Sequence, residues 1–384
     1  MPVTRRMVAL ALAALLATTQ LACKPPTEDE LWQFHALKVS GEFVPLRGDF
    51  DGDGTSDVLW YGRGELPDAV WFGRVGKRGA TSFIRRDLRI DGHYTPQVAD
   101  IVGDERDEVL WISPSPSSAL RYWDFDASTK AHRARIIYSV PNHDRAVVLA
   151  DRRGPGHKDD LWLGGGRLRF ADDGSGAITA IPMAVSSAYQ MIIGDWNGDG
   201  LEDILWYAPG RANDYRWDLY DDGTYRSTRV TANGPYVPVV VSRQGGDDIF
   251  WWASGEARDA LWGGGGDAFR SIPIPQLGIV GRVHRTFVDA VVIAVPGGRD
   301  VLFTVGSDDV GEFYNLAHPA RDKTSEQVPI AGDYDGDHRL DLLWYGAGTR
   351  GDELWYFRLG GADDLLAADA SGAAGTGPTM VARS

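Results

Sequence analysis

Short apolar runs alternate with acidic or glycine-rich turns along almost the whole chain. The runs are four or five residues long and rich in β-branched and aromatic side chains, as at 146–149 and 237–241. Runs of this length and composition, bounded by aspartate and glycine, predict β-strands rather than amphipathic helices. The pattern therefore predicts an all-β protein.

One acidic turn occurs three times, and each copy runs directly into a strand. The copies cover residues 49–57, 195–203 and 333–341, and we call them the first, second and third loop. Each places an acid or amide at its first, third, fifth and ninth positions, and the strand that follows ends in Trp-Tyr. This repetition indicates an internal structural repeat.

The repeat extends beyond the three complete loops. Four further copies have lost some of their acids; they keep Asp100, Asp104 and Glu108, Asp151 and Asp159, Asp247 and Asp248, and Asp300. Seven aromatic anchors follow the turns, 41 to 52 residues apart: Trp60, Trp111, Trp162, Trp206, Trp251, Phe303 and Trp344. A second aromatic follows each anchor: Trp71, Trp123, Phe170, Trp217, Trp262, Tyr314 and Trp355.

The period has the size of a propeller blade. Four short strands in about 40–50 residues form one blade, so we predict a seven-bladed β-propeller over residues 31–366. Six or eight blades, or several β-sandwiches, are the alternatives. The segment 31–34 resembles 354–357, so we expect it to supply a missing strand to the last blade.

The spacing of the acids predicts a hard cation. Oxygen side chains at alternate positions suit Ca²⁺, which takes 6–8 oxygen ligands in flexible geometry. An EF-hand is excluded, because it needs a bidentate Glu at position twelve, where these loops have Trp. Position nine must close the site instead, and position seven would contribute its backbone carbonyl. The predicted ligands are Asp49, Asp51, Asp53, Thr55 and Asp57; Asp195, Asn197, Asp199, Leu201 and Asp203; and Asp333, Asp335, Asp337, Arg339 and Asp341.

The loops resemble the calcium loops of FG-GAP/VCBS repeats, the blades of integrin-α-like β-propellers. The sequences after the loops, 61–64, 207–210 and 345–348, fit that resemblance, which implies that the loop joins two strands of a blade and binds Ca²⁺. The third loop departs at its sixth position, where His338 replaces Gly54 and Gly200. That position needs a positive φ, which His tolerates less well than Gly, so we expect the third site to be weaker.

The N-terminus has the layout of an export signal. Arg5 and Arg6 precede an apolar stretch, and the sole cysteine, Cys23, follows it; the stretch is too short to span a bilayer. The region resembles a bacterial lipobox, although Gln20 replaces the usual Leu, and simple secretion is the alternative. We expect a signal peptide over 1–22, a linker over 23–30, a disordered tail over 367–384, and lipid anchoring in the cell envelope. Lys24 favours the outer membrane in a two-membrane cell.

Charge and motifs favour binding over catalysis. The net charge of −15 disfavours nucleic acid. Neither a nucleophile elbow nor a zinc motif is present, and the glycine pattern at 346–351 leads into a strand rather than the helix of a dinucleotide site. We expect a monomer, bound to the membrane only through its lipid, that binds a protein or a glycan. Trp252 and Tyr236 lie outside the repeat register and are therefore freer than the periodic aromatics to stack on a ligand. A polysaccharide lyase or hydrolase, or a structural subunit of an envelope complex, is the alternative.

Overall fold

The computed structural model describes most of the region predicted to fold. The described residues are 32–75, 81–114, 120–138, 147–154, 156–163, 166–170, 178–182, 189–243, 246–253, 259–263, 270–273, 282–285, 290–294, 300–305, 311–316, 327–339 and 341–357. The predicted signal peptide, Cys23, the linker and the tail lie outside them. Within these ranges no helix is present that is long and apolar enough to cross a membrane.

The strands in this part of the chain form seven four-stranded antiparallel sheets, which we number along the chain. Sheet one contains β2 (Val44–Gly48), β3 (Asp57–Tyr61), β4 (Asp68–Val75) and β5 (Thr81–Leu88). Sheet two contains β6 (Thr95–Ala99), β7 (Glu108–Ile112), β8 (Leu120–Phe125) and β9 (His132–Tyr138). Sheet three contains β10 (Val147–Leu149), β11 (Asp160–Leu163), β12 (Gly166–Phe170) and β13 (Ile178–Pro182).

The remaining sheets repeat this order. Sheet four contains β14 (Gln190–Gly194), β15 (Asp203–Tyr207), β16 (Asp214–Leu219) and β17 (Tyr225–Val230). Sheet five contains β18 (Val237–Arg243), β19 (Gly246–Trp252), β20 (Ala260–Gly263) and β21 (Arg270–Pro273). Sheet six contains β22 (Arg282–Arg285), β23 (Ala290–Ala294), β24 (Asp300–Val305) and β25 (Gly311–Leu316). Sheet seven contains β26 (Val328–Gly332), β27 (Asp341–Tyr345), β28 (Asp352–Phe357) and β1 (Trp32–Leu37).

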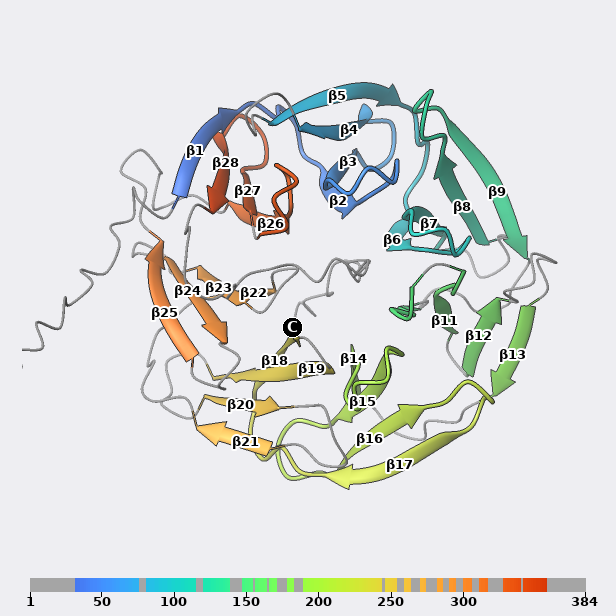
Figure 1. Cartoon of the computed structure of the whole chain (residues 1–384), viewed down its shortest axis with the longest axis vertical. Coiled ribbons are helices and arrows are strands. Elements are labelled where there is room, and N and C mark those ends of the chain that lie inside the picture. The colour runs from blue at the N-terminus through green and yellow to red at the C-terminus, as the bar shows by residue number, and fades with distance from the viewer. Residues whose placement is uncertain are drawn as a thin grey trace, which may run out of the picture.

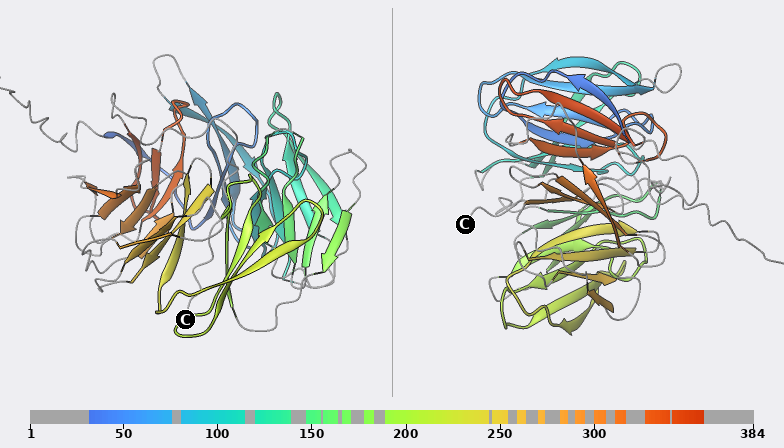
Figure 2. Two further views of the ribbon diagram at one scale, coloured as in Figure 1. Left: turned by 60° about the horizontal axis from the view of Figure 1, so that its bottom comes forward. Right: turned by 90° about the vertical axis from the view of Figure 1, so that its left-hand side faces the viewer.

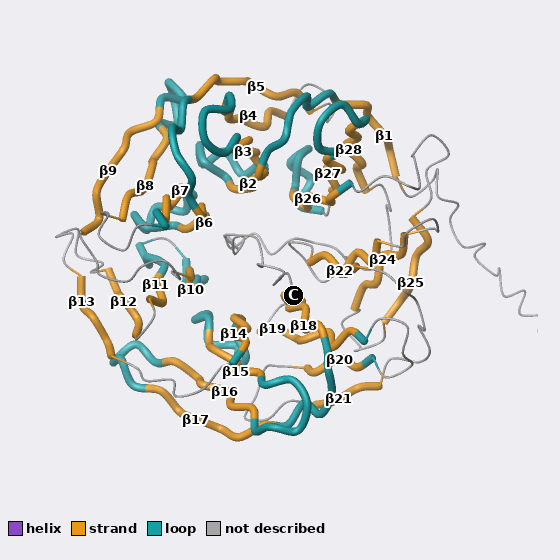
Figure 3. The backbone as a smooth tube through the Cα atoms, turned by 180° about the vertical axis from the view of Figure 1, so that it is seen from behind, coloured by secondary structure: helices purple, strands orange, loops and turns teal. Residues whose placement is uncertain are grey.

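The sheets follow one another around a ring (Figure 1). In each, the first strand faces the centre and the fourth lies on the circumference, and the side views show the sheets standing next to each other (Figure 2). Seen from behind, the described residues consist of strands and loops only (Figure 3). The prediction of an all-β propeller is confirmed.

The ring closes through the N-terminal strand. β1 pairs antiparallel with β28, from Trp32 opposite Phe357 to Leu37 opposite Asp352. This confirms the expectation that the N-terminal segment supplies the last sheet with its missing strand. The pairing covers an edge that would otherwise expose unpaired backbone groups.

The anchor aromatics pack between neighbouring sheets. Successive side chains of a strand point to opposite faces, so Trp60 contacts Tyr345 of sheet seven while Tyr61 contacts Trp111 of sheet two, with ring centroids 5.1 and 5.2 Å apart. The Tyr61–Trp111 pair is edge-to-face, a geometry that stabilises a core beyond the burial of area. The second strand is correspondingly buried along its whole length in sheet one.

Two aromatics are less available than we expected. Trp252 is buried and stacks on Phe250, 6.0 Å away between centroids. Tyr236 is half-buried against Trp251 and donates its backbone N–H to the hydroxyl of Tyr207 at 3.0 Å. The expectation that Trp252 stands free to stack on a ligand is wrong, because it packs inside sheet five.

Candidate metal centre

The three complete loops join the first and second strands of sheets one, four and seven. In each, the first aspartate folds the loop around its own carboxylate. Asp49 accepts the N–H groups of Gly52 at 2.8 Å and Asp53 at 3.1 Å on Oδ1, and that of Gly54 at 2.9 Å on Oδ2. Asp195 and Asp333 accept the corresponding three N–H groups. The three loops therefore share one backbone conformation.

The sixth position of each loop has a positive φ. Gly54 and Gly200 have φ of 84° and 89°, and His338 has φ of 61°. This confirms the conformational demand inferred from the sequence, and it places a residue with a Cβ in the left-handed region. Such a conformation costs a non-glycine residue about 1–2 kcal/mol.

The ninth acid closes the loop from the strand side. Asp57 accepts the N–H of Phe50 on Oδ2 at 2.9 Å and the N–H of Gly73 on Oδ1 at 2.7 Å. Asp203 accepts the matching N–H groups of Trp196 and Leu219, and Asp341 accepts that of Tyr334. These acids are fully buried.

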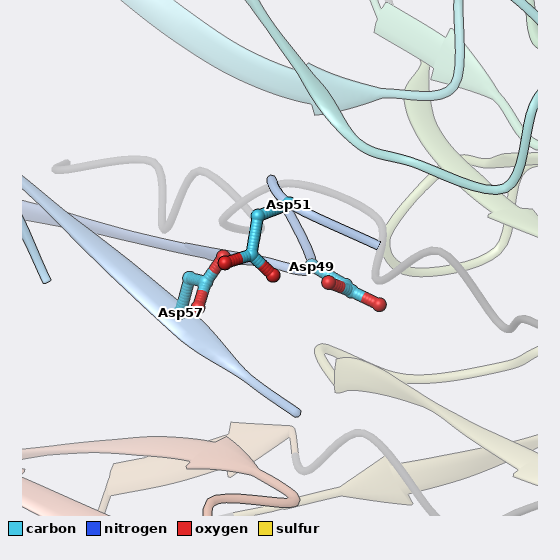
Figure 4. Close-up of side chains that lie close together, drawn as sticks. All are labelled: Asp49, Asp51 and Asp57. Atoms are coloured by element: carbon cyan, nitrogen blue, oxygen red, sulfur yellow. The ribbon is translucent and has the colours of Figure 1, made fainter. Parts of the chain in front are cut away.

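Three carboxylates converge in the first loop and three in the third. One carboxylate oxygen from each of Asp49, Asp51 and Asp57 lies within 4.8 Å of the other two, with Asp51 between Asp49 and Asp57 (Figure 4). Asp333, Asp335 and Asp341 form the same group in the third loop. Positions one, three and nine therefore meet as predicted in these two loops.

The fifth acids are not among the grouped carboxylates of the first and third loops. Asp53, Asp199 and Asp337 are exposed at the rim of their loops. In the second loop Asn197 occupies the third position, and its Nδ2 donates to Asp199 Oδ2 at 3.0 Å. At position seven, Thr55 and Leu201 are buried and Arg339 is half-buried; the assignment of their carbonyl oxygens as ligands stays a prediction.

Burial raises the pKa values of first and ninth acids in the loops. Removal from water, followed by the charge of Asp51, raises the pKa of Asp57 well above its ordinary value. Burial raises the pKa of Asp341 to about 9, with Asp335 adding to the effect, and the pKa of Asp203 to about 9. Burial likewise raises the pKa of Asp49 to about 6. A divalent cation would reverse this effect, because it favours the ionised form.

The first loop offers a buried oxygen that fits such a cation. Asp51 is 3% exposed, and its Oδ1 has no hydrogen-bond partner among the described residues. A buried carboxylate oxygen in that state is costly unless a ligand meets it. An all-oxygen set of carboxylates suits Ca²⁺, Mg²⁺ or Mn²⁺ rather than a soft metal. The residues therefore fit a hard metal ion.

Sequence reasoning missed the residue that precedes the ninth acid. Asp107 Oδ2 accepts the N–H of Asp49 at 2.8 Å, and the N–H of Asp107 donates to the carbonyl of Asp49 at 3.0 Å. Glu202 makes the same reciprocal pair of hydrogen bonds with Ala150, and Asp247 makes it with Asp195. Ser56 makes it with Asp333. These bonds link the loops of neighbouring sheets on one face of the ring. An acid or Ser directly before the ninth position was the available signal.

A second tie, at the other end of the strands, was also missed. The hydroxyl of Tyr61 donates to the carbonyl of Gly92 and accepts the N–H of Tyr94, at 2.8 and 2.9 Å. Asp68 accepts the N–H groups of Gly62 and Ile90. After the second loop, the hydroxyl of Tyr207 donates to the carbonyl of Gly234, and Asp214 takes the role of Asp68. After the third loop, the hydroxyl of Tyr345 donates to the carbonyl of Gly41, and Asp352 takes the role of Asp68. The sequence signal is a Gly-x-aromatic triplet between sheets, at 41–43, 92–94 and 234–236.

No protein family matches this sequence, and no curated protein does. Among solved structures, the fold is similar to that of an Agrocybe aegerita lectin that specifically recognises non-reducing terminal N-acetylglucosamine. The TM-score is 0.56 at 15% identity, over 73% of this chain and 81% of the lectin. AofleA from Arthrobotrys oligospora aligns over 86% of this chain and 94% of its own with a TM-score of 0.40 and 10% identity, too low to support a conclusion. The chain therefore has a β-propeller fold similar to that of a fungal lectin.

Proposed function

We propose that this protein is an exported glycan-binding module, a seven-bladed propeller of FG-GAP/VCBS-like repeats stabilised by Ca²⁺. The observation that carries the proposal is the similarity of its fold to a lectin that recognises terminal N-acetylglucosamine. The same similarity supports binding rather than catalysis. A protein ligand is the alternative outcome of the test.

The calcium part of the proposal is supported by the loops themselves. One carboxylate oxygen from each of Asp49, Asp51 and Asp57 lies close enough to the others to share one ion, and Asp51 Oδ1 lacks a partner among the described residues. Ca²⁺ tolerates the irregular geometry that such a loop offers, whereas Mg²⁺ demands a near-ideal octahedron. In this role the metal would hold Asp49 and Asp57, whose pKa values burial raises, ionised inside the fold and stiffen the loop.

A glycan array with the purified protein tests the ligand class. We expect binding to a defined subset of glycans, with terminal N-acetylglucosamine as the first candidate, and loss of binding after thermal unfolding. A pull-down from cell extract with the same protein distinguishes a protein ligand. Two results together would contradict the lectin proposal. The folded protein would bind no glycan on the array, and it would still capture a single protein from an extract treated with glycosidases.

Lipid anchoring at Cys23 is a separate part of the proposal and has its own test. The cysteine follows an apolar stretch at the N-terminus, so Cys23→Ser should give an unprocessed or released protein. Membrane association that persists both in Cys23→Ser and in cells treated with globomycin, an inhibitor of lipoprotein processing, would exclude the anchor and favour simple secretion.

A further inference from the structure

Two basic side chains reach into the first loop from outside it. Arg74, in β4 of the same sheet, donates from Nη2 to Asp51 Oδ2 at 2.8 Å and from Nη1 to Asp53. Lys130, in the turn between β8 and β9 of sheet two, forms an ion pair with the same Asp51 oxygen. The two cations therefore converge on the acid at the centre of the predicted metal cluster.

The position of Lys130 is set by its turn and by burial. Its side chain is only 9% exposed, and its Nζ lies 5.5 Å from the centre of the Phe72 ring. Its backbone is left-handed, with φ of 59°, and its N–H donates to the carbonyl of Asp126 at 2.8 Å. The carboxylate of Asp126 in turn accepts hydrogen bonds from Ser128 and Thr129. The ammonium group is therefore held at the loop rather than placed there by a freely moving side chain.

The other two loops differ at the comparable exposed acid. Asp53 is paired with Arg74, whereas Asp199 and Asp337 have no ion pair in the part of the chain that the structure describes. Asp199 is met by Asn197 and by the N–H of Leu201, and Asp337 by the N–H of Arg339. Among the described residues of the three loops, an arginine of the third strand therefore pairs with the fifth acid in the first loop only; Arg358, which has the register of Arg74 in sheet seven, lies outside them.

We infer that Arg74 and Lys130 are internal counter-ions of the first loop and that they lower its affinity for a metal ion. The inference rests on the proposed function, since it takes the loop to be a calcium site. A cation that enters the cluster must share Asp51 with two positive charges, and like charges a few Å apart repel strongly at a partly buried site. Because Lys130 comes from sheet two, metal entry into the loop of sheet one also weakens a contact between the two sheets.

Calorimetric titration of chelator-treated protein with CaCl₂ tests the inference. Lys130→Met keeps the apolar stem over Phe72 and removes the charge, and Arg74→Met does the same for the second cation. Each should tighten one calcium site by about tenfold or more, equivalent to removing a repulsion of about 1.4 kcal/mol. In chelator, Lys130→Met should melt below the wild type, because Asp51 has lost a counter-ion, and it should gain more than the wild type when Ca²⁺ is added.

Two further variants make the result specific to the loop. Arg133→Gln removes a positive charge beside the same turn, where Arg133 pairs with Asp126 at 3.0 Å and not with the loop; it should leave every calcium affinity unchanged. Adding Asp57→Asn to Lys130→Met should abolish the gain. A gain that survives Asp57→Asn, or that Arg133→Gln reproduces, overturns the inference.

The remaining outcomes separate the inference from the proposed function. If the wild type binds Ca²⁺ and neither Lys130→Met nor Arg74→Met alters any affinity beyond twofold, the inference alone fails. If the wild type binds no Ca²⁺ but a variant does, the inference holds, and Arg74 and Lys130 neutralise the first loop of the wild type in place of the metal. If no protein in the series takes up Ca²⁺, the calcium part of the proposed function fails together with the inference.

Discussion

At the scale of single residues, the ninth acids of the first and second loops, Asp57 and Asp203, each bond to the backbone on two sides. Asp57 accepts one N–H from its own loop at Phe50 and another from the next strand at Gly73. Both donors are buried with it, so they cannot turn to water when the acceptor is removed. The closing acid therefore supports the sheet even without a metal.

Asp57→Ala should lower the free energy of unfolding in the presence of chelator by about 1–3 kcal/mol for each buried donor left without an acceptor. Urea denaturation followed by circular dichroism measures the change. Asp199→Ala is the control, because this acid is exposed and its loss should cost no more than about 0.5 kcal/mol. Equal effects of the two variants would show that the closing role is not specific to position nine.

His338→Gly should stabilise the protein, because it removes a left-handed conformation from a residue with a Cβ. The expected gain is about 1 kcal/mol, with tighter calcium binding by the third loop. Gly54→Ala is the converse variant: a Cβ there meets no atom within 4 Å, so it introduces only the conformational cost. Thermal unfolding checks both, and a loss of stability in His338→Gly would contradict the argument.

At the scale of elements, the sheets are joined by the reciprocal bonds between neighbouring loops. Asp107→Ala should expose the amide of Asp49 to exchange, because that N–H loses its acceptor at 2.8 Å. Asp107→Ser should retain part of the protection, since Ser56 makes the equivalent bond to Asp333 at 3.0 Å. Hydrogen exchange of the Asp49 amide distinguishes the two variants. Unchanged protection in Asp107→Ala would show that the carboxylate does not hold the neighbouring sheet.

The same carboxyl makes stability depend on pH. Burial raises the pKa of Asp107 to about 7 in the folded protein, against about 3.9 in an unfolded chain. Between these values the folded state binds more protons than the unfolded state, so the free energy of unfolding falls as pH rises from about 4 to 7. Asp107→Asn should flatten that slope in urea titrations across the range. A slope identical to that of the wild type would assign the effect to other acids.

At the scale of the whole molecule, chelation should lower the melting temperature and Ca²⁺ should restore it better than Mg²⁺. An ion that binds only the folded state adds about 2.7 kcal/mol at a hundredfold excess over its Kd, and Mg²⁺ fits an irregular loop poorly. The first and third loops belong to sheets one and seven, where the chain closes (Figure 1), and they bond to each other through Ser56 and Asp333. Metal in these two loops would thus stabilise the point of closure.

Differential scanning calorimetry with EDTA, CaCl₂ and MgCl₂ measures this response. Asp51→Ala and Asp335→Ala should each remove part of the calcium effect, because each removes one carboxylate from a cluster of three. A melting temperature that ignores both chelator and Ca²⁺, with no calcium uptake at millimolar concentration, would show the loops to be polar turns held by their own hydrogen bonds.

The local features of this protein were determined by the sequence alone. The strand positions, the acidic turns and the left-handed sixth position follow from patterns a few residues long, because turn chemistry and strand alternation act over that range. Even the closing strand was visible, since residues 31–34 resemble 354–357. The convergence of Asp49, Asp51 and Asp57 was predictable for the same reason, as one loop contains all three.

Only the tertiary structure decided which distant residues meet. Asp107 and Asp49 are 58 positions apart, and Ser56 and Asp333 are 277 apart, so no local pattern assigns their bonds. Lys130 lies in a turn of sheet two with nothing in its surrounding sequence to mark a partner in sheet one, yet it reaches Asp51. Trp252 lies outside the repeat register, yet its side chain is buried and stacks on Phe250 of the same strand. These contacts depend on how neighbouring sheets pack around the ring, and that packing sets the electrostatics of the loops.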